Sequence, residues 1–171
     1  MTAHRLIGAA LAAALVLALG ACGREDAATA AAEQRVIMPL DDSPVPATLH
    51  GLDVEEENIA ETLEGAKRPY LDAATLYSLR AGTALQATLQ VGRFTSDRRY
   101  QTDTFRQTLA NRIADGIAAD LRMGDDTVWM TSGDRQSIAI WFKDEYIFIL
   151  SAREEYESQR ALLREALEIT P

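Results

Sequence analysis

Few side chains in this sequence are of the types that perform catalysis or hold a metal. The chain has one cysteine and two histidines, and only His50 lies beyond the apolar N-terminus. A zinc site needs several histidine or cysteine ligands, and a serine–histidine–aspartate relay needs a histidine within the folded domain. No phosphate-binding glycine loop, HExxH or GxSxG motif is present. We therefore expect no cofactor, no metal and no enzymatic activity, with a carboxylate pair such as Asp125 and Asp126 as the alternative.

A cluster of arginines stands out in a chain that is otherwise acidic. It lies in the stretch GRFTSDRRYQTDTFR and comprises Arg93, Arg98, Arg99 and Arg106. Arginines beside aromatic residues bind the phosphate or carboxylate groups of an anionic partner. The alternative is pairing with acids of the chain itself, such as Asp97 and Asp103, and the abundance of acids favours this alternative.

The single cysteine, Cys22, follows a short cationic start and an apolar run. Arg5 precedes the uninterrupted run 6–20, whose length fits the core of a signal peptide and is short for a transmembrane helix. The residues Leu19, Gly20 and Ala21 then lead into Cys22. This arrangement resembles the signal peptide and lipobox of bacterial lipoproteins. The resemblance implies cleavage between Ala21 and Cys22 and attachment of acyl chains, such as palmitate, to the Cys22 thiol.

The lipoprotein resemblance implies a location in the cell envelope, anchored to the membrane on its extracytoplasmic side. Two acyl chains hold a protein stably, whereas one gives only marginal binding, so diacylated Cys22 is a sufficient anchor. That compartment is oxidising, but without a second cysteine the fold has no internal disulfide. An ordinary secretory signal, with Cys22 incidental, and a retained transmembrane anchor are the alternatives.

The charge of the chain limits its partners. It carries 17 Lys+Arg against 26 Asp+Glu, a formal net charge of -9. A phosphate backbone repels such a chain, so we expect no nucleic-acid partner. The expected partners are the membrane, through the lipid anchor, and an envelope protein or anionic polymer.

The sequence divides into three parts. We expect a signal peptide at 1–21, lipidated Cys22 and a flexible tether at 22–47, and a single α+β domain at 48–171 with its core at about 69–169. Prolines at 39, 44 and 46 favour extended geometry in the tether. The alternative for its middle is that the consecutive apolar residues within RVIMPL form a strand or pack on the domain.

Hydrophobic periodicity predicts the elements of the domain. Residues 52–64 are predicted as a short acidic helix. Residues 74–79 and 85–94 are predicted as a hairpin around Gly82, because apolar residues alternate in the second run. An apolar stripe repeating every four residues predicts a helix over 103–121.

The last third of the domain is the most apolar. Residues 127–152 are predicted as three strands, the second and third of which are apolar on both faces, as in central strands covered on both sides. Trp141 is expected in the interior, and 155–169 is predicted as a final helix. The fold class is therefore α+β, an antiparallel sheet of about five strands in the order ββ-α-βββ-α with two main helices.

These features favour a non-catalytic accessory or binding module of the cell envelope. A carrier of a small apolar ligand in a cavity between sheet and helices is the alternative. A carboxylate-based hydrolase is the third candidate, and the scarcity of catalytic residue types places it last.

Overall fold

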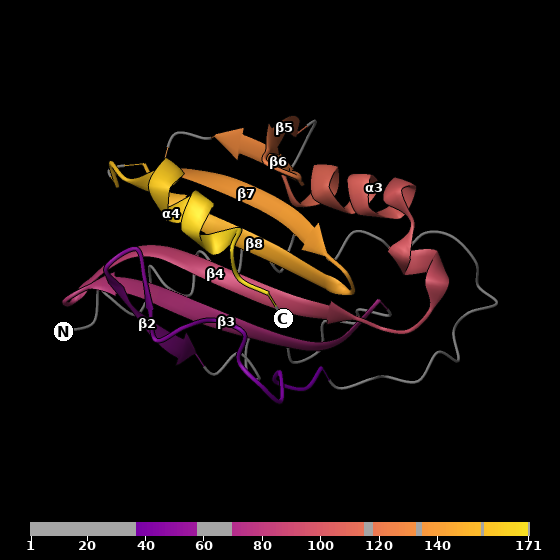
Figure 1. Ribbon diagram of the computed structural model, residues 1–171, viewed down its shortest axis with the longest axis horizontal. Coiled ribbons are helices and arrows are strands. Elements are labelled where there is room, and N and C mark those ends of the chain that lie inside the picture. Colours follow the sequence, from indigo (N-terminus) through magenta and orange to yellow (C-terminus); the bar gives the residue numbers. More distant parts are fainter. Residues whose placement is uncertain (1–36, 58–69, 115–117, 133–134, 155, 171) are drawn as a thin grey trace.

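The computed structural model describes residues 37–57, 70–114, 118–132, 135–154 and 156–170. Strands within them form one antiparallel sheet in the spatial order β1-β2-β3-β4-β8-β7-β6-β5 (Figure 1). The strands are β1 (Thr48–Leu49), β2 (Leu52–Glu57), β3 (Leu71–Ala81), β4 (Ala84–Phe94), β5 (Ala119–Met123), β6 (Asp126–Ser132), β7 (Gln136–Lys143) and β8 (Tyr146–Arg153). With helices α3 (Asp103–Ile113) and α4 (Gln159–Ala166), this is an α+β fold.

The predicted hairpin and the three predicted strands of residues 127–152 are confirmed. β3 and β4 form a long hairpin that turns at Gly82, where φ is +58°. β6, β7 and β8 form an antiparallel meander, and β8 joins the two groups by pairing with β4. The sheet nevertheless has eight strands rather than about five, so the predicted number and order of elements were wrong.

The first correction concerns the acidic stretch predicted as a helix. Its described part forms β2, which pairs with β3. Leu52 and Val54 alternate with exposed Asp53 and Glu55, the period of a strand with one dry face. The carboxylate of Glu55 lies 3.0 Å from Nε of Arg80 on β3, so a cross-strand ion pair offsets the acidity of the run. Residues 58–64 lie outside the described residues.

The second correction concerns the helix predicted over 103–121. α3 begins at Asp103 as expected but ends at Ile113, and Leu121 belongs to strand β5. The apolar spacing that suggested a continuous helix therefore joined two elements. Gly124, with φ +66°, then allows the tight turn into β6. The final helix is confirmed in its centre, because α4 falls within the predicted 155–169.

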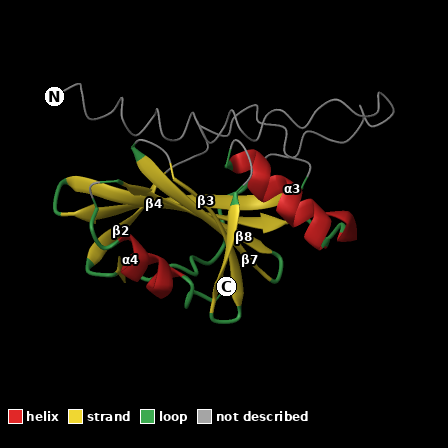
Figure 2. Ribbon diagram, turned by 90° about the horizontal axis from the view of Figure 1, so that it is seen from above, coloured by secondary structure: helices red, strands yellow, loops and turns green. Residues whose placement is uncertain are grey.

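Helices cover the sheet on both faces. α3 and α4 lie on opposite sides of it (Figure 2). On the α4 face the buried core includes Trp141, Phe148 and Leu163; on the α3 face it includes Phe94 and Ile140. Side chains along β7 and β8 alternate between the two cores, which confirms that these strands are central and covered on both sides.

The described end of the predicted tether, 37–47, lies against the domain. Met38 forms an isolated parallel bridge with Ala73, and the N–H of Leu40 donates to Oγ1 of Thr75 at 3.1 Å. Val45 is 8% exposed and belongs to the α4-face core. The packed structure therefore begins before residue 48, as in the packing alternative for RVIMPL, and the expected boundary there was too late.

Candidate functional site

The residues predicted to carry the lipid anchor, Ala21 and Cys22, lie outside the described residues. Their assignment stays a prediction from the sequence. Within the described part of the chain, no helix combines the length and apolar character required to cross a membrane.

Arg93, the first of the predicted cluster, is engaged by an acid of the chain. It lies near the end of β4, and its Nε donates to Oδ1 of Asp72 on β3 at 2.9 Å. The hydrogen bond to this carboxylate raises the pKa of the Arg93 guanidinium. A partly exposed pair of this kind ties β3 to β4 and leaves less of the guanidinium's charge for an external anion.

Arg106 is engaged by backbone and an aromatic ring. It lies in the first turn of α3, and its guanidinium carbon stands 5.4 Å from the centre of the Phe142 ring. Its Nη2 donates to the main-chain carbonyl of Asp144, in the turn between β7 and β8. These contacts fasten α3 to the sheet, and such a cation–π pair adds about 0.5–2 kcal/mol.

Arg98 and Arg99 lie in η1 (Arg98–Gln101), a single 3-10 turn leading to α3. The Arg98 side chain is exposed, and the side chain of Arg99 is outside the described part of the structure. The helix that follows is capped by Thr102, whose hydroxyl accepts from the N–H of Phe105 at 3.3 Å. The four predicted arginines therefore do not form a single described site: two make internal contacts, and Arg98 faces solvent.

A hollow that the sequence did not indicate lies between the N-terminal part of α4 and strands β6, β7 and β8. Its volume is about 250 Å³, and it is partly open to solvent. Its apolar lining comprises Met130, Ala139, Leu150, Ala152 and Leu163. Its polar lining comprises Ser132, Ser137, Gln159 and Arg160.

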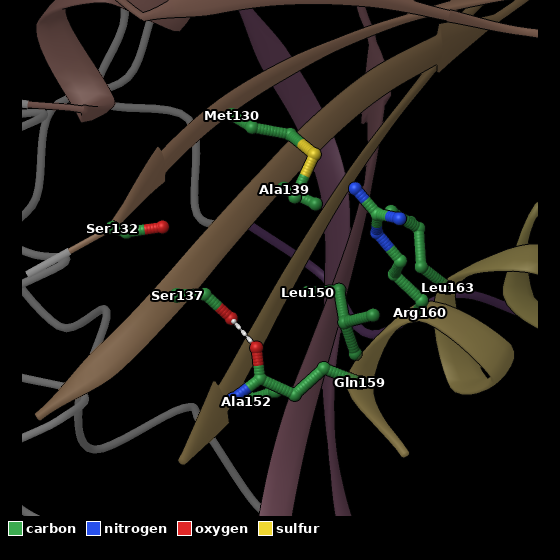
Figure 3. A pocket seen from close by; sticks show the side chains of 9 residues that line it. All are labelled: Met130, Ser132, Ser137, Ala139, Leu150, Ala152, Gln159, Arg160 and Leu163. Carbon is green, nitrogen blue, oxygen red and sulfur yellow. Dashed lines mark hydrogen bonds between the residues drawn. The ribbon is translucent and has the colours of Figure 1, made fainter. Parts of the chain in front are cut away.

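Hydrogen bonds fix one wall of this hollow. The hydroxyl of Ser137 donates to Oε1 of Gln159 at 2.7 Å, which links β7 to the start of α4 (Figure 3). Nε2 of Gln159 in turn donates to the carbonyl of Arg153 at 2.7 Å. The side chain of Arg160 extends from α4 toward the sheet. The hollow thus combines an apolar floor with an exposed positive charge at its rim.

Small side chains explain why the hollow exists. Ala139 and Ala152 occupy inward positions on strands whose other inward positions hold large side chains such as Trp141, Phe148 and Leu150. An alanine at such a position leaves a gap in the packing unless a side chain from a neighbouring element fills it. These two alanines within very apolar strands are the feature of the sequence that indicates the hollow. They can be interpreted in this way only when the position of α4 is known.

The described lining of the hollow offers apolar contact, hydrogen bonds and one positive charge. Among the described residues that line it, none is a carboxylate, histidine or cysteine. Elsewhere in the described residues, no group of three or more His, Cys, Asp or Glu is placed to hold a metal ion. Asp125 and Asp126, the carboxylates singled out in the sequence, sit at the β5–β6 turn, where Oδ2 of Asp126 lies 3.9 Å from Nζ of Lys143.

Comparison with known proteins gives no family for the chain: no family model, no curated protein and no solved structure matches it.

Proposed function

We propose that this protein is a lipid-anchored module of the cell envelope that binds a partner on the extracytoplasmic side of the membrane and performs no catalysis. The observation that carries the proposal is the order of features in the first 22 residues: Arg5, the apolar run 6–20, and Leu19-Gly20-Ala21-Cys22. Diacylation of Cys22 supplies enough membrane affinity to need no further element.

The hollow beside α4 supports a binding role. Its floor is apolar, and Ser132, Ser137 and Arg160 at its walls offer hydrogen bonds and positive charge. This combination suits a peptide segment of an envelope protein that presents an apolar side chain next to an acidic group. A volume of about 250 Å³ is below the roughly 300–1,000 Å³ typical of small-molecule pockets. The hollow therefore favours an accessory or binding module over a carrier.

Carriage of a small apolar ligand is the second candidate, because a hollow does lie between sheet and helix as that function requires. A ligand of roughly ten heavy atoms fits a volume of about 250 Å³, since a cavity of about 150 Å³ holds benzene. A carboxylate-based hydrolase receives no support at this hollow, since none of its described lining residues is an acid.

The anchor is tested by Cys22→Ala in the full chain. The wild-type protein should fractionate with membranes and yield an N-terminal peptide with the mass of a diacylglyceryl-modified cysteine. The Cys22→Ala protein should stay unprocessed and lack lipid. Normal cleavage of the variant, or a soluble and unlipidated wild-type protein, would overturn the proposal.

The binding surface is tested by site-specific photo-cross-linking in intact cells. A photoreactive residue replacing Ser132, on the hollow's wall, should give a discrete cross-linked adduct with an envelope component. The matched control replaces Thr83, an exposed residue in the turn between β3 and β4. Equal adducts at both positions, or none at Ser132, would remove the hollow from the proposal.

A further inference from the structure

β5 is an edge strand of the sheet that the described residues form. Among the described strands it is the last in the spatial order, and its one partner there is β6 (Figure 1). Its residues are exposed from Ala119 to Arg122, including Leu121, which is 42% exposed. The strand at the opposite end, β1, has only two residues. A free edge with an exposed apolar residue is a template for pairing with another strand.

The hairpin geometry identifies which backbone groups face outward. Met123 and Asp126 are paired across the two-residue turn at Gly124 and Asp125, so they form the closing hydrogen-bonded pair of the hairpin. Hydrogen-bonded and non-hydrogen-bonded pairs alternate along an antiparallel ladder. Leu121, paired with Val128, therefore bonds inward. The N–H and C=O groups of Asp120 and Arg122 point to the free edge.

The charges on β5 are self-complementary about Leu121. The strand reads Ala-Asp-Leu-Arg-Met. When two copies run antiparallel with Leu121 opposite Leu121, Asp120 of each lies opposite Arg122 of the other. Within the described residues, neither Asp120 nor Arg122 has a side-chain hydrogen bond or an ion pair that this pairing would break. We propose that β5 pairs edge to edge with β5 of a second copy, with the two-fold axis at Leu121.

This register uses the outward backbone groups. Each Asp120–Arg122 pair across the axis becomes a hydrogen-bonded pair, in which the two residues exchange both main-chain bonds. Leu121 then meets its counterpart as a non-hydrogen-bonded pair, where side chains come closest. Leu121 shares a face with its partner Val128, which is completely buried in the α4-face core. The contact thus extends that apolar face across the axis.

The neighbouring two-fold registers are unfavourable. Centring the axis on Asp120 places two aspartates opposite each other, and centring it on Arg122 places two arginines opposite each other. Like charges directly opposite on paired strands are destabilising. The alternating charges of β5 therefore select one register.

The association is expected to be weak and dependent on concentration. β5 has five residues, and its pairing buries much less than the roughly 1,200–2,000 Å² of a standard stable interface. Confinement of both copies to one membrane, if the proposed anchor is present, raises their effective concentration without new contacts. The pairing itself does not depend on that anchor.

Charge exchange tests the register. Full chains purified in detergent are compared by sedimentation equilibrium in wild-type form and as Asp120→Arg, Arg122→Asp and the double variant carrying both. All of them share residues 1–36, so differences between them report on β5. Each single variant should associate about tenfold more weakly than the wild type, because like charges then face each other.

Two further samples should restore the association that the single variants lose. The double variant should regain wild-type association. An equimolar mixture of the two single variants should also associate, since one copy then supplies arginine at both positions and the other supplies aspartate. Circular dichroism checks that each variant is folded. A wild type that stays monomeric at about 0.1 mM, single variants equal to it, or a mixture that fails to associate would each overturn the proposal.

Disulfide trapping tests the position of the axis. In a Cys22→Ser background, Leu121→Cys places two thiols in a close cross-strand pair, near the separation that a disulfide needs. Ala119→Cys is the control, because Ala119 would lie opposite Met123 and far from its own counterpart. A covalent dimer from Leu121→Cys alone supports the axis. Equal dimer yields, or none from Leu121→Cys, would contradict it.

Discussion

Glu165 on α4 holds the turn between β1 and β2. One oxygen of its carboxylate accepts from the backbone N–H of His50 at 2.7 Å, and the other lies 3.2 Å from Nδ1 of the same residue. His50 and Gly51 have φ values of +52° and +72°, as the two centre residues of a type I′ turn require. One side chain thus joins the first described hairpin to the last helix, 115 residues later.

Replacing Glu165 by alanine should lower the free energy of unfolding by about 1 kcal/mol, because a part-buried main-chain N–H loses its acceptor. Glu165→Gln should cost less, since the amide oxygen still accepts that hydrogen bond. The side chain of Glu165 is 44% exposed, so the ionic contribution is small. Urea denaturation measures both variants. Glu168→Ala, a change at an exposed residue just beyond α4, is the control. An equal decrease in its free energy of unfolding would show that the contacts of Glu165 with His50 add no stability of their own.

Elements with local signals were predictable. The alternation of Leu85, Ala87, Leu89 and Val91 defines a strand without help from the rest of the chain, and Gly82 marks its turn. The three strands of 127–152 follow from their length and apolar content. β2 was not predictable in the same way, because its acidic residues fit the first turn of a helix equally well. As a strand it pairs with β3, where Arg80 forms an ion pair with Glu55 and Ser78 donates a hydrogen bond to Glu57.

The candidate site was predictable only in part. Sequence reasoning found the arginines, but it did not show that Asp72 and the carbonyl of Asp144 engage two of them. Those partners lie in other strands and turns, so their proximity is a product of strand order. The hollow likewise depends on how α4 docks, and no periodicity within α4 or β7 encodes that placement.

Trp141 is completely buried and lies stacked on Phe148, with ring centres 5.2 Å apart. This confirms the expected interior position. Trp141→Ala should cost about 3–5 kcal/mol as a large-to-small change in the core. Trp141→Phe should cost much less, because it keeps the stacking and removes a buried indole N–H that has no hydrogen-bond partner among the described residues.

Thermal or urea unfolding, followed by circular dichroism, measures both tryptophan variants. Trp129→Phe is the matched control, since Trp129 is only half-buried and packs on the other face of the sheet. If Trp141→Phe were as damaging as Trp141→Ala, the indole N–H would have a stabilising role that the structure does not show.

The arginine cluster separates into structural and solvent-facing members. Arg93→Gln should lower the free energy of unfolding by up to about 1 kcal/mol, because it breaks a partly exposed pair with Asp72. The double variant Arg98→Gln and Arg99→Gln should leave stability nearly unchanged. If η1 contacts an anionic envelope partner, the double variant should bind anionic vesicles or phosphate polymers more weakly than Arg93→Gln does.

Denaturation and vesicle co-sedimentation on the same preparations separate these outcomes. Asp72→Asn serves as the partner control and should reproduce the stability loss of Arg93→Gln. A large stability loss in the double variant, with unchanged binding, would assign Arg98 and Arg99 a structural role and remove the anion-binding hypothesis.

Because of the buried phenol of Tyr77, we expect the free energy of unfolding to fall at alkaline pH. Burial raises the pKa of its phenol above the usual value near 10, and the hydroxyl of Ser43 donates to its oxygen at 2.9 Å. A raised pKa means that the folded state favours the neutral phenol. This stabilisation is complete below about pH 10, the pKa in the unfolded chain, and is lost as the pH rises through the folded-state value.

The Tyr77→Phe variant removes the ionisable group, so its stability should fall less steeply than that of the wild type above about pH 10. At neutral pH it should be less stable by about 0.5–1.5 kcal/mol, because the Ser43 hydroxyl loses its acceptor. Urea denaturation at a series of pH values from neutral to alkaline measures both effects. Tyr156→Phe is the comparison: burial also raises the pKa of Tyr156, but its side chain is more exposed, so its effect should be smaller. Parallel curves for wild type and Tyr77→Phe would show that the buried phenol of Tyr77 does not cause the alkaline loss.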